Sequence, residues 1–82
     1  MDSTTIEQII RAGLPGAEVS VSGADGVHFE AHVISSAFAG KSTLQRHRMV
    51  YATLGELMGR EIHALGLRTD VPERPEQTPA SQ

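Results

Sequence analysis

Four histidines are the side chains of this sequence best suited to chemistry, and no cysteine accompanies them: His28, His32, His47 and His63. A neutral imidazole, whose free pKa is about 6.5, is a good metal ligand at cellular pH. His28 and His32 are four residues apart, but the sequence around them predicts a strand rather than a helix. That spacing along a strand separates them by roughly 13 Å. These two histidines therefore cannot bind one ion together.

His28 and His63 form a different pair, because each stands near the beginning of a predicted strand. If the two strands run parallel, they begin at the same end of the sheet, and the two imidazoles belong to one edge. Two imidazoles without a cysteine make an incomplete metal site. The remaining ligands must then come from another molecule.

Three basic residues lie in a stretch without acids, which runs from residue 31 to residue 55: Lys41, Arg46 and Arg48. The net charge of −3 argues against a general affinity for nucleic acid. A helix-turn-helix would need a second recognition helix, and Gly55 and Gly59 are one residue too far apart for a Gly-x-x-Gly loop. The three cations are therefore predicted to be solvated or to face a partner, with a nucleic-acid surface as the alternative.

The segment Gly40-Lys41-Ser42 resembles the end of a phosphate-binding loop, but Ser35 stands where that motif requires its first glycine. Gly40 is predicted to turn the chain, and Ser42 to cap the helix that follows. His47 falls on the apolar stripe of that helix, so it is predicted to be a hydrogen-bonded structural histidine.

Composition favours a single domain that is not an enzyme. Eighty-two residues allow one modest core, and no nucleophile stands in a recognisable elbow. No pair of carboxylates marks a site, so no small-molecule substrate is expected. There is neither an apolar run of membrane-spanning length nor a secretory signal after Met1, and we expect a soluble cytoplasmic protein without membrane contact.

The first half of the chain predicts a helix and a hairpin. Thr4 and Glu7 have capping-box spacing, ahead of a short helix over about residues 5–12. Alternation predicts strands over 18–22 and 27–35, joined by a turn at 23–26. In the second strand, Phe29, Ala31 and Val33 share the inward face, while His28, Glu30, His32 and Ile34 share the solvated face.

The second half predicts a long helix and a third strand. Ser42 and Gln45 offer a second capping box, after a connector over residues 35–40 with one helical turn. An apolar stripe follows along the helix, through Leu44, His47, Tyr51, Leu54 and Met58, and it is widened by Val50 and Leu57. Gly55 interrupts this helix and is expected to mark a bend or a close contact. Residues 61–69 predict a strand, and the Pro-rich residues 70–82 a flexible tail after a domain over 1–69.

These elements predict an α+β domain of order αββααβ, the connector's helical turn included. The first two strands form an antiparallel hairpin. The link to the third strand contains a helix, so strands two and three can run parallel through a right-handed crossover. The result is a three-stranded mixed sheet covered on one face by helices.

Three segments carry a resemblance to the BolA family: residues 38–42, residues 46–51 and the run Ile62-His63-Ala64-Leu65. The resemblance covers about residues 19–69. It implies a KH-like fold of the second topology. It also implies a heterodimer with a monothiol glutaredoxin, which shares a [2Fe–2S] cluster through its cysteine and a glutathione thiol. The family's C-terminal ligand histidine falls on His63, and the second ligand on His28. The isolated chain would then hold no cofactor.

The expected function is therefore a non-enzymatic adaptor in iron–sulfur cluster handling. The alternative is a nucleic-acid-binding regulator of transcription or of a stress response, with weak binding expected. The tail departs from the family pattern, because residues 71–75 replace a short terminal helix.

Overall fold

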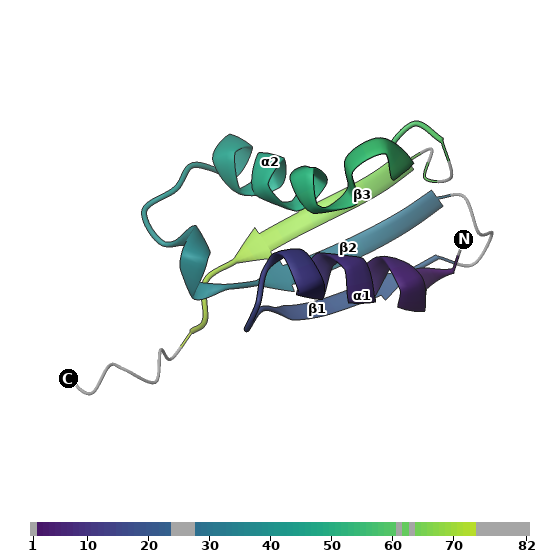
Figure 1. The fold of residues 1–82 in the computed structure, drawn as a ribbon. Coiled ribbons are helices and arrows are strands. Elements are labelled where there is room, and N and C mark those ends of the chain that lie inside the picture. The colour runs from purple at the N-terminus through teal and green to yellow at the C-terminus, as the bar shows by residue number, and fades with distance from the viewer. Residues whose placement is uncertain (1, 24–27, 61, 63, 74–82) are drawn as a thin grey trace.

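The protein is described by a computed structural model that covers residues 2–23, 28–60, 62 and 64–73. Its elements follow in chain order: α1 (Ser3–Gly13), β1 (Glu18–Ser22), β2 (His28–Ile34), the 3-10 turn η1 (Ser36–Phe38), α2 (Thr43–Leu54), the 3-10 turn η2 (Gly55–Leu57) and β3 (Ala64–Asp70). Figure 1 shows the two helices lying across the strands. The predicted order of elements is confirmed. The predicted turn at 23–26 lies largely outside the described residues, as do residues 74–82 of the predicted tail.

The first helix begins earlier than predicted, because a different residue caps it. Asp2 is the N-cap, and its Oδ1 accepts a hydrogen bond from the Thr5 N–H at 2.9 Å. That bond holds the pKa of Asp2 below its ordinary value. Glu7 instead pairs with Arg11 one turn later, at 3.0 Å. The capping box predicted for Thr4 and Glu7 is therefore wrong.

The sheet has the strand order β1-β2-β3. β1 and β2 pair antiparallel with Val19 opposite Val33, and β2 and β3 pair parallel with Phe29 opposite Leu65. Burial alternates along β2, with Phe29, Ala31 and Val33 inside, as predicted. β3 ends at Asp70, one residue beyond its predicted end, and begins at Ala64.

The second helix has its predicted start, and its buried face departs from the predicted stripe at one residue, Leu44. Ser42 and Gln45 form the capping box. The helix ends at Leu54, because Gly55 takes a backbone φ of +55°, which residues other than glycine rarely adopt. Val50 and Leu54 face the core, whereas Leu44 is 59% exposed. The predicted stripe through Leu44 is therefore wrong at its first residue, which lies on the flank of the helix.

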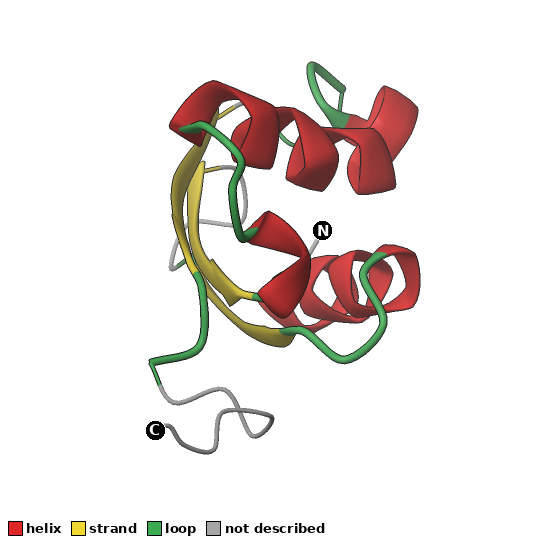
Figure 2. Ribbon diagram, turned by 90° about the vertical axis from the view of Figure 1, so that its left-hand side faces the viewer, coloured by secondary structure: helices red, strands yellow, loops and turns green. Residues whose placement is uncertain are grey.

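The core lies between the sheet and the helices. Its fully buried side chains come from both helices, the connector, β2 and the approach to β3: Ile6, Ile10, Val33, Phe38, Val50 and Ile62. The helices pack closely, since a Cβ on Gly13 would lie 2.5 Å from Thr53 Cγ2. In Figure 2 both helices stand on one side of the sheet, and no helix of the described chain covers its other face. Among the described residues, no helix combines the length and apolar character needed to cross a bilayer.

Candidate functional site

His28 begins β2 and is exposed on the face of the sheet opposite the core. In the parallel register its partner on β3 is Ala64, which directly follows His63 in the sequence. His63 itself lies outside the described residues, so its approach to His28 stays a prediction. The described register does bring the start of β3 beside His28. This is the arrangement that the parallel-strand argument required.

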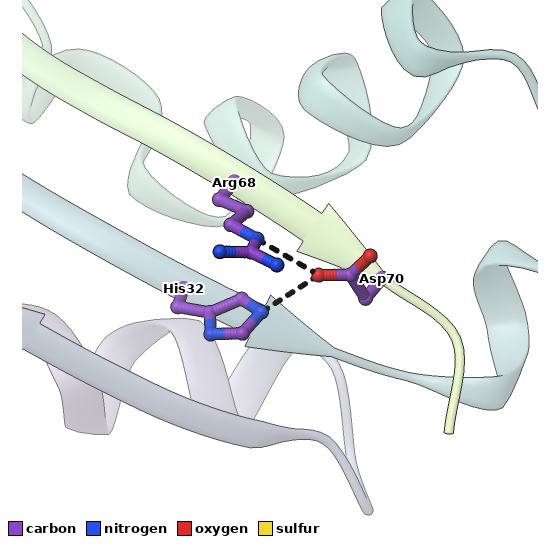
Figure 3. A network of polar contacts seen from close by, with 3 residues as sticks. All are labelled: His32, Arg68 and Asp70. Atoms are coloured by element: carbon purple, nitrogen blue, oxygen red, sulfur yellow. Dashed lines mark hydrogen bonds and ion pairs between the residues drawn. The ribbon is translucent and has the colours of Figure 1, made fainter. Parts of the chain in front are cut away.

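His32 lies four residues further along β2 and is held by a carboxylate on β3. Its Nε2 is 2.8 Å from Asp70 Oδ2, and Arg68 Nε donates to the same oxygen at 3.2 Å (Figure 3). The hydrogen bond from His32, with that from Arg68, holds the pKa of the Asp70 carboxyl below its ordinary value of 3.8. His32 is thus held by the Asp70 carboxylate, which Arg68 also contacts, and it lies away from His28. We name His32, Arg68 and Asp70 the β3 polar cluster.

The β3 polar cluster was missed by sequence reasoning, which assigned Asp70 to the tail. Arg68 and Asp70 lie two residues apart on the outward face of β3, and the register sets Arg68 opposite His32. The period-two alternation of residues 64–70 was the available signal. Its extension to Asp70 depends on pairing with Ile34, a contact that no local pattern contains.

Within the described part of the chain, no three histidine, acidic or cysteine side chains gather closely enough to hold a metal ion. The β3 polar cluster does not count as such a site, because its carboxylate is already engaged by two donors. His28 is an exposed imidazole, a ligand type that suits zinc, copper, iron and nickel, but one imidazole is not a complete site. The described side chains therefore do not make a complete metal site by themselves.

Arg46 is committed to its own connector rather than to a common basic face. Its Nε donates to the carbonyl oxygens of Phe38 at 3.1 Å and Lys41 at 2.9 Å. Arg48 lies two residues along α2, which places it about 200° around the helix axis from Arg46. Lys41 and Arg48 are exposed. The three predicted cations therefore do not form one continuous surface.

The two predicted structural residues stand in the same region. Gly40 has a φ of +77° and turns the chain between η1 and α2, as predicted. His47 is half-buried, and its ring meets the Tyr51 ring edge-on, with centroids 6.4 Å apart. Among the described residues, His47 makes this ring contact and not the hydrogen bond that we predicted. His47 therefore packs on the flank of α2.

Comparison with known proteins gives consistent results. The family model described as BolA-like protein matches residues 12–74. "Protein BOLA2" of Arabidopsis thaliana is 50% identical over 50 residues, covering 61% of this chain and 53% of that protein. A bolA protein homologue from Coxiella burnetii superposes with a TM-score of 0.79 at 45% identity, covering 88% of this chain and 92% of that structure. The chain spans about a third to a half of the length of the first curated relatives that it matches.

Two further matches carry more specific names. The "DNA-binding transcriptional regulator BolA" of Escherichia coli is 45% identical over 42 residues, covering 51% of this chain and 40% of that protein. The BolA domain of SufE1 from Arabidopsis thaliana superposes with a TM-score of 0.72 at 29% identity, covering 85% of this chain and 91% of that domain. A related sequence therefore occurs in a protein named as a regulator, and the same fold occurs as a domain of another protein. The matching family model is not that of an enzyme family.

Proposed function

This chain belongs to the BolA family, and on that premise we propose that it is a non-enzymatic adaptor in iron–sulfur cluster handling. In this proposal it works in the cytoplasm as a heterodimer with a monothiol glutaredoxin. A [2Fe–2S] cluster is shared between the two proteins. His63 and His28 are the proposed ligands from this chain, and the glutaredoxin cysteine and a glutathione thiol complete the set.

One observation carries the proposal: exposed His28 pairs in register with Ala64, the residue after His63 in the sequence. Two further facts support it. The chain contains no cysteine, so thiolate ligands would have to come from a partner. The described residues also hold no three-ligand group that could bind the cluster without one.

Imidazole ligands give such a cluster distinct properties. Replacing thiolate by histidine raises the reduction potential of a [2Fe–2S] centre. It also makes binding depend on pH, because a histidine must be deprotonated to ligate. A cluster held in this way would be released more readily than one held by four thiolates. That property suits transfer or sensing rather than storage.

The test is reconstitution of the cluster from separate components. The full chain is mixed anaerobically with a monothiol glutaredoxin, glutathione, iron and sulfide, and visible absorbance and circular dichroism are recorded. We expect a spectrum that differs from that of the glutaredoxin alone. The proposal is wrong if the spectrum is the same with and without this chain at every ratio of the two proteins.

A second candidate function rests on the name of the Escherichia coli relative, a DNA-binding transcriptional regulator. Lys41 and Arg48 are exposed and could contact phosphates, whereas Arg46 donates to two carbonyls of the connector. Replacing Lys41 and Arg48 with alanine should then flatten the salt dependence of binding by about 2 units of log slope or less. Submicromolar binding of the wild-type chain at physiological salt would place this function first.

A further inference from the structure

The uncovered face of the sheet is a surface that the proposed function leaves unassigned. Its outward residues form rows across the strands, because partners in register project to the same side. From one end to the other, the rows are His28 and Ala64; Ser22, Glu30 and Gly66; Ser20, His32 and Arg68; Glu18, Ile34 and Asp70. No helix lies over these rows in Figure 2. We call this surface the open sheet face.

His28 belongs to the open sheet face, and this fixes the side from which its ring can be reached. Burial alternates along β2, so His28 projects away from the core while Phe29 projects into it. Both helices occupy the opposite side. Any group bound by the His28 imidazole, and any molecule that carries this group, must therefore stand over the open sheet face.

The surface next to His28 is low enough for close approach. Ala64 shares its row, and Ser22 and Gly66 occupy the ends of the next row. The Glu30 side chain leans across Gly66, since its Cγ and Oε2 lie 3.6 Å from the place where a Cβ on Gly66 would stand. Among the described residues of these two rows, one carboxylate therefore borders this low area, and no bulky apolar side chain does.

The far end of the open sheet face carries fixed charge. Arg68 is 76% exposed and is oriented by Asp70, which also holds His32 (Figure 3). Shallow hollows lie on both sides of this β3 polar cluster, one toward Ser20 and Glu30 and the other toward Val71 and Glu73. An oriented, exposed guanidinium between two hollows can pair with a carboxylate of a docking protein.

We infer that the thiol-bearing partner docks on the open sheet face, with a footprint that runs from His28 to Arg68. The inference rests on the proposed function and adds the surface that this function uses. The occupant is the glutaredoxin itself, because the protein that supplies the other cluster ligands has to reach a ring projecting from this face. The basic residues Lys41, in the connector before α2, and Arg48, on α2, are then outside the interface.

The test compares two lysine substitutions on opposite sides of the molecule. Ser20→Lys puts a long cation into the open sheet face, in the row of His32 and Arg68 and away from the proposed ligands. Gln8→Lys adds the same charge on the exposed surface of α1. Calorimetric titration with a monothiol glutaredoxin and glutathione, with and without cluster, should give a Kd about tenfold higher or more for Ser20→Lys. Gln8→Lys should change the Kd by less than about twofold.

Arg68→Gln is a second variant that removes charge without adding bulk, and it should also raise the Kd. Circular dichroism of each chain alone verifies the fold. If the wild-type chain never alters the cluster spectrum, the proposed function fails and this inference fails with it. If the spectrum changes but all three variants bind like the wild type, the docking surface alone is wrong. Equal losses for Ser20→Lys and Gln8→Lys, or a homodimer that Ser20→Lys disrupts, would also overturn the inference.

Discussion

A histidine that projects from a bare sheet face contributes little to packing, and this makes His28 a residue to alter without damage to the core. It is exposed, and its neighbour Phe29 fills the core instead. His32 is different, because Asp70 ties it to β3 at 2.8 Å. Two histidines on one strand face therefore have separate tasks. The difference arises from their strand partners and not from their residue type.

The first prediction concerns the proposed ligands. His63→Ala should weaken or alter the shared cluster, because one ligand of the set is lost and solvent or a thiol must replace it. His28→Ala should have a smaller effect if the preceding loop offers another donor. The measurement is visible circular dichroism of the reconstituted heterodimer, with a thermal melt of each variant alone.

His47→Ala is the control and should act mainly on stability, since that ring packs on Tyr51. An unchanged cluster spectrum for His63→Ala, together with a normal melt, would remove His63 from the ligand set.

The second prediction uses the lowered pKa of Asp70. The folded protein holds this pKa below 3.8, so the stabilisation is present above 3.8 and is lost as the pH falls through the folded value. Asp70→Asn should therefore lower the melting temperature at about pH 6, and the gap from wild type should close as the pH falls below 3.8. Glu56→Gln, which removes another exposed carboxylate, is the charge control. A gap that stays constant with pH would contradict this role for Asp70.

Local sequence patterns predict which side of a strand a residue occupies, but not which residue it meets across the sheet. The outward position of His28 follows from alternation alone. The bonds from Arg46 to the Phe38 and Lys41 carbonyls, and the bond between His32 and Asp70, depend on how distant segments come together. For this reason Arg46 was predicted to be a surface cation although it holds the connector. His63 lies outside the described residues, so both its side of the sheet and its neighbours stay predictions.

At the scale of elements, α2 was predicted correctly as a helix, but one residue of its predicted apolar stripe lies in solvent. The structure buries Val50 and Leu54, both of which belong to the predicted stripe, and Tyr51 is half-buried against the core. Leu44 is 59% exposed, because packing against the rest of the fold, and not the helix pattern alone, sets which side is covered. The capping signal at Ser42 is local, and it was predicted correctly.

The third prediction tests that cap. Ser42 Oγ accepts from the Gln45 N–H at 3.1 Å, and Gln45 Oε1 accepts from the Ser42 N–H at 2.9 Å. Ser42→Ala should lower the free energy of unfolding by about 1 kcal/mol, because an N–H at the start of α2 loses its partner. Urea denaturation measures the change. Ser36→Ala, at an exposed serine of η1, is the matched control and should have little effect. Equal losses in both variants would argue against the cap.

At the scale of the whole molecule, one core supports one sheet face and leaves the other to solvent or to a partner. The described core draws on every helix and strand and ends at Leu65. Asp70 adds a hydrogen bond beyond that core, because its backbone carbonyl accepts from the Ser35 N–H at 3.0 Å. The folded unit therefore extends past Thr69. Flexibility of the residues that follow stays a prediction.

The fourth prediction places the end of the folded unit. A chain of residues 1–73 should melt like the full chain, because no described core residue lies beyond Leu65. A chain of residues 1–69 should melt lower, since Ser35 and His32 both lose their partner on Asp70. The lost backbone hydrogen bond alone is worth about 1 kcal/mol, or about 4–8 °C for a domain of this size. Differential scanning calorimetry of the two truncations decides the matter, and equal melting temperatures would assign Asp70 to the tail.

The parallel pairing of β2 with β3 also sets the order in which the molecule can fold. The hairpin of β1 and β2 closes over a short loop, whereas β3 reaches β2 only after residues 35–63 have crossed the sheet. Such non-local pairing is slow, because a long loop must close before its contacts stabilise anything. Until then one edge of β2 is open, and Phe29 and Val33 lack their strand partners Leu65 and Thr69. A chain in which only the hairpin has formed would therefore be the state of this protein most exposed to aggregation and to chaperone capture.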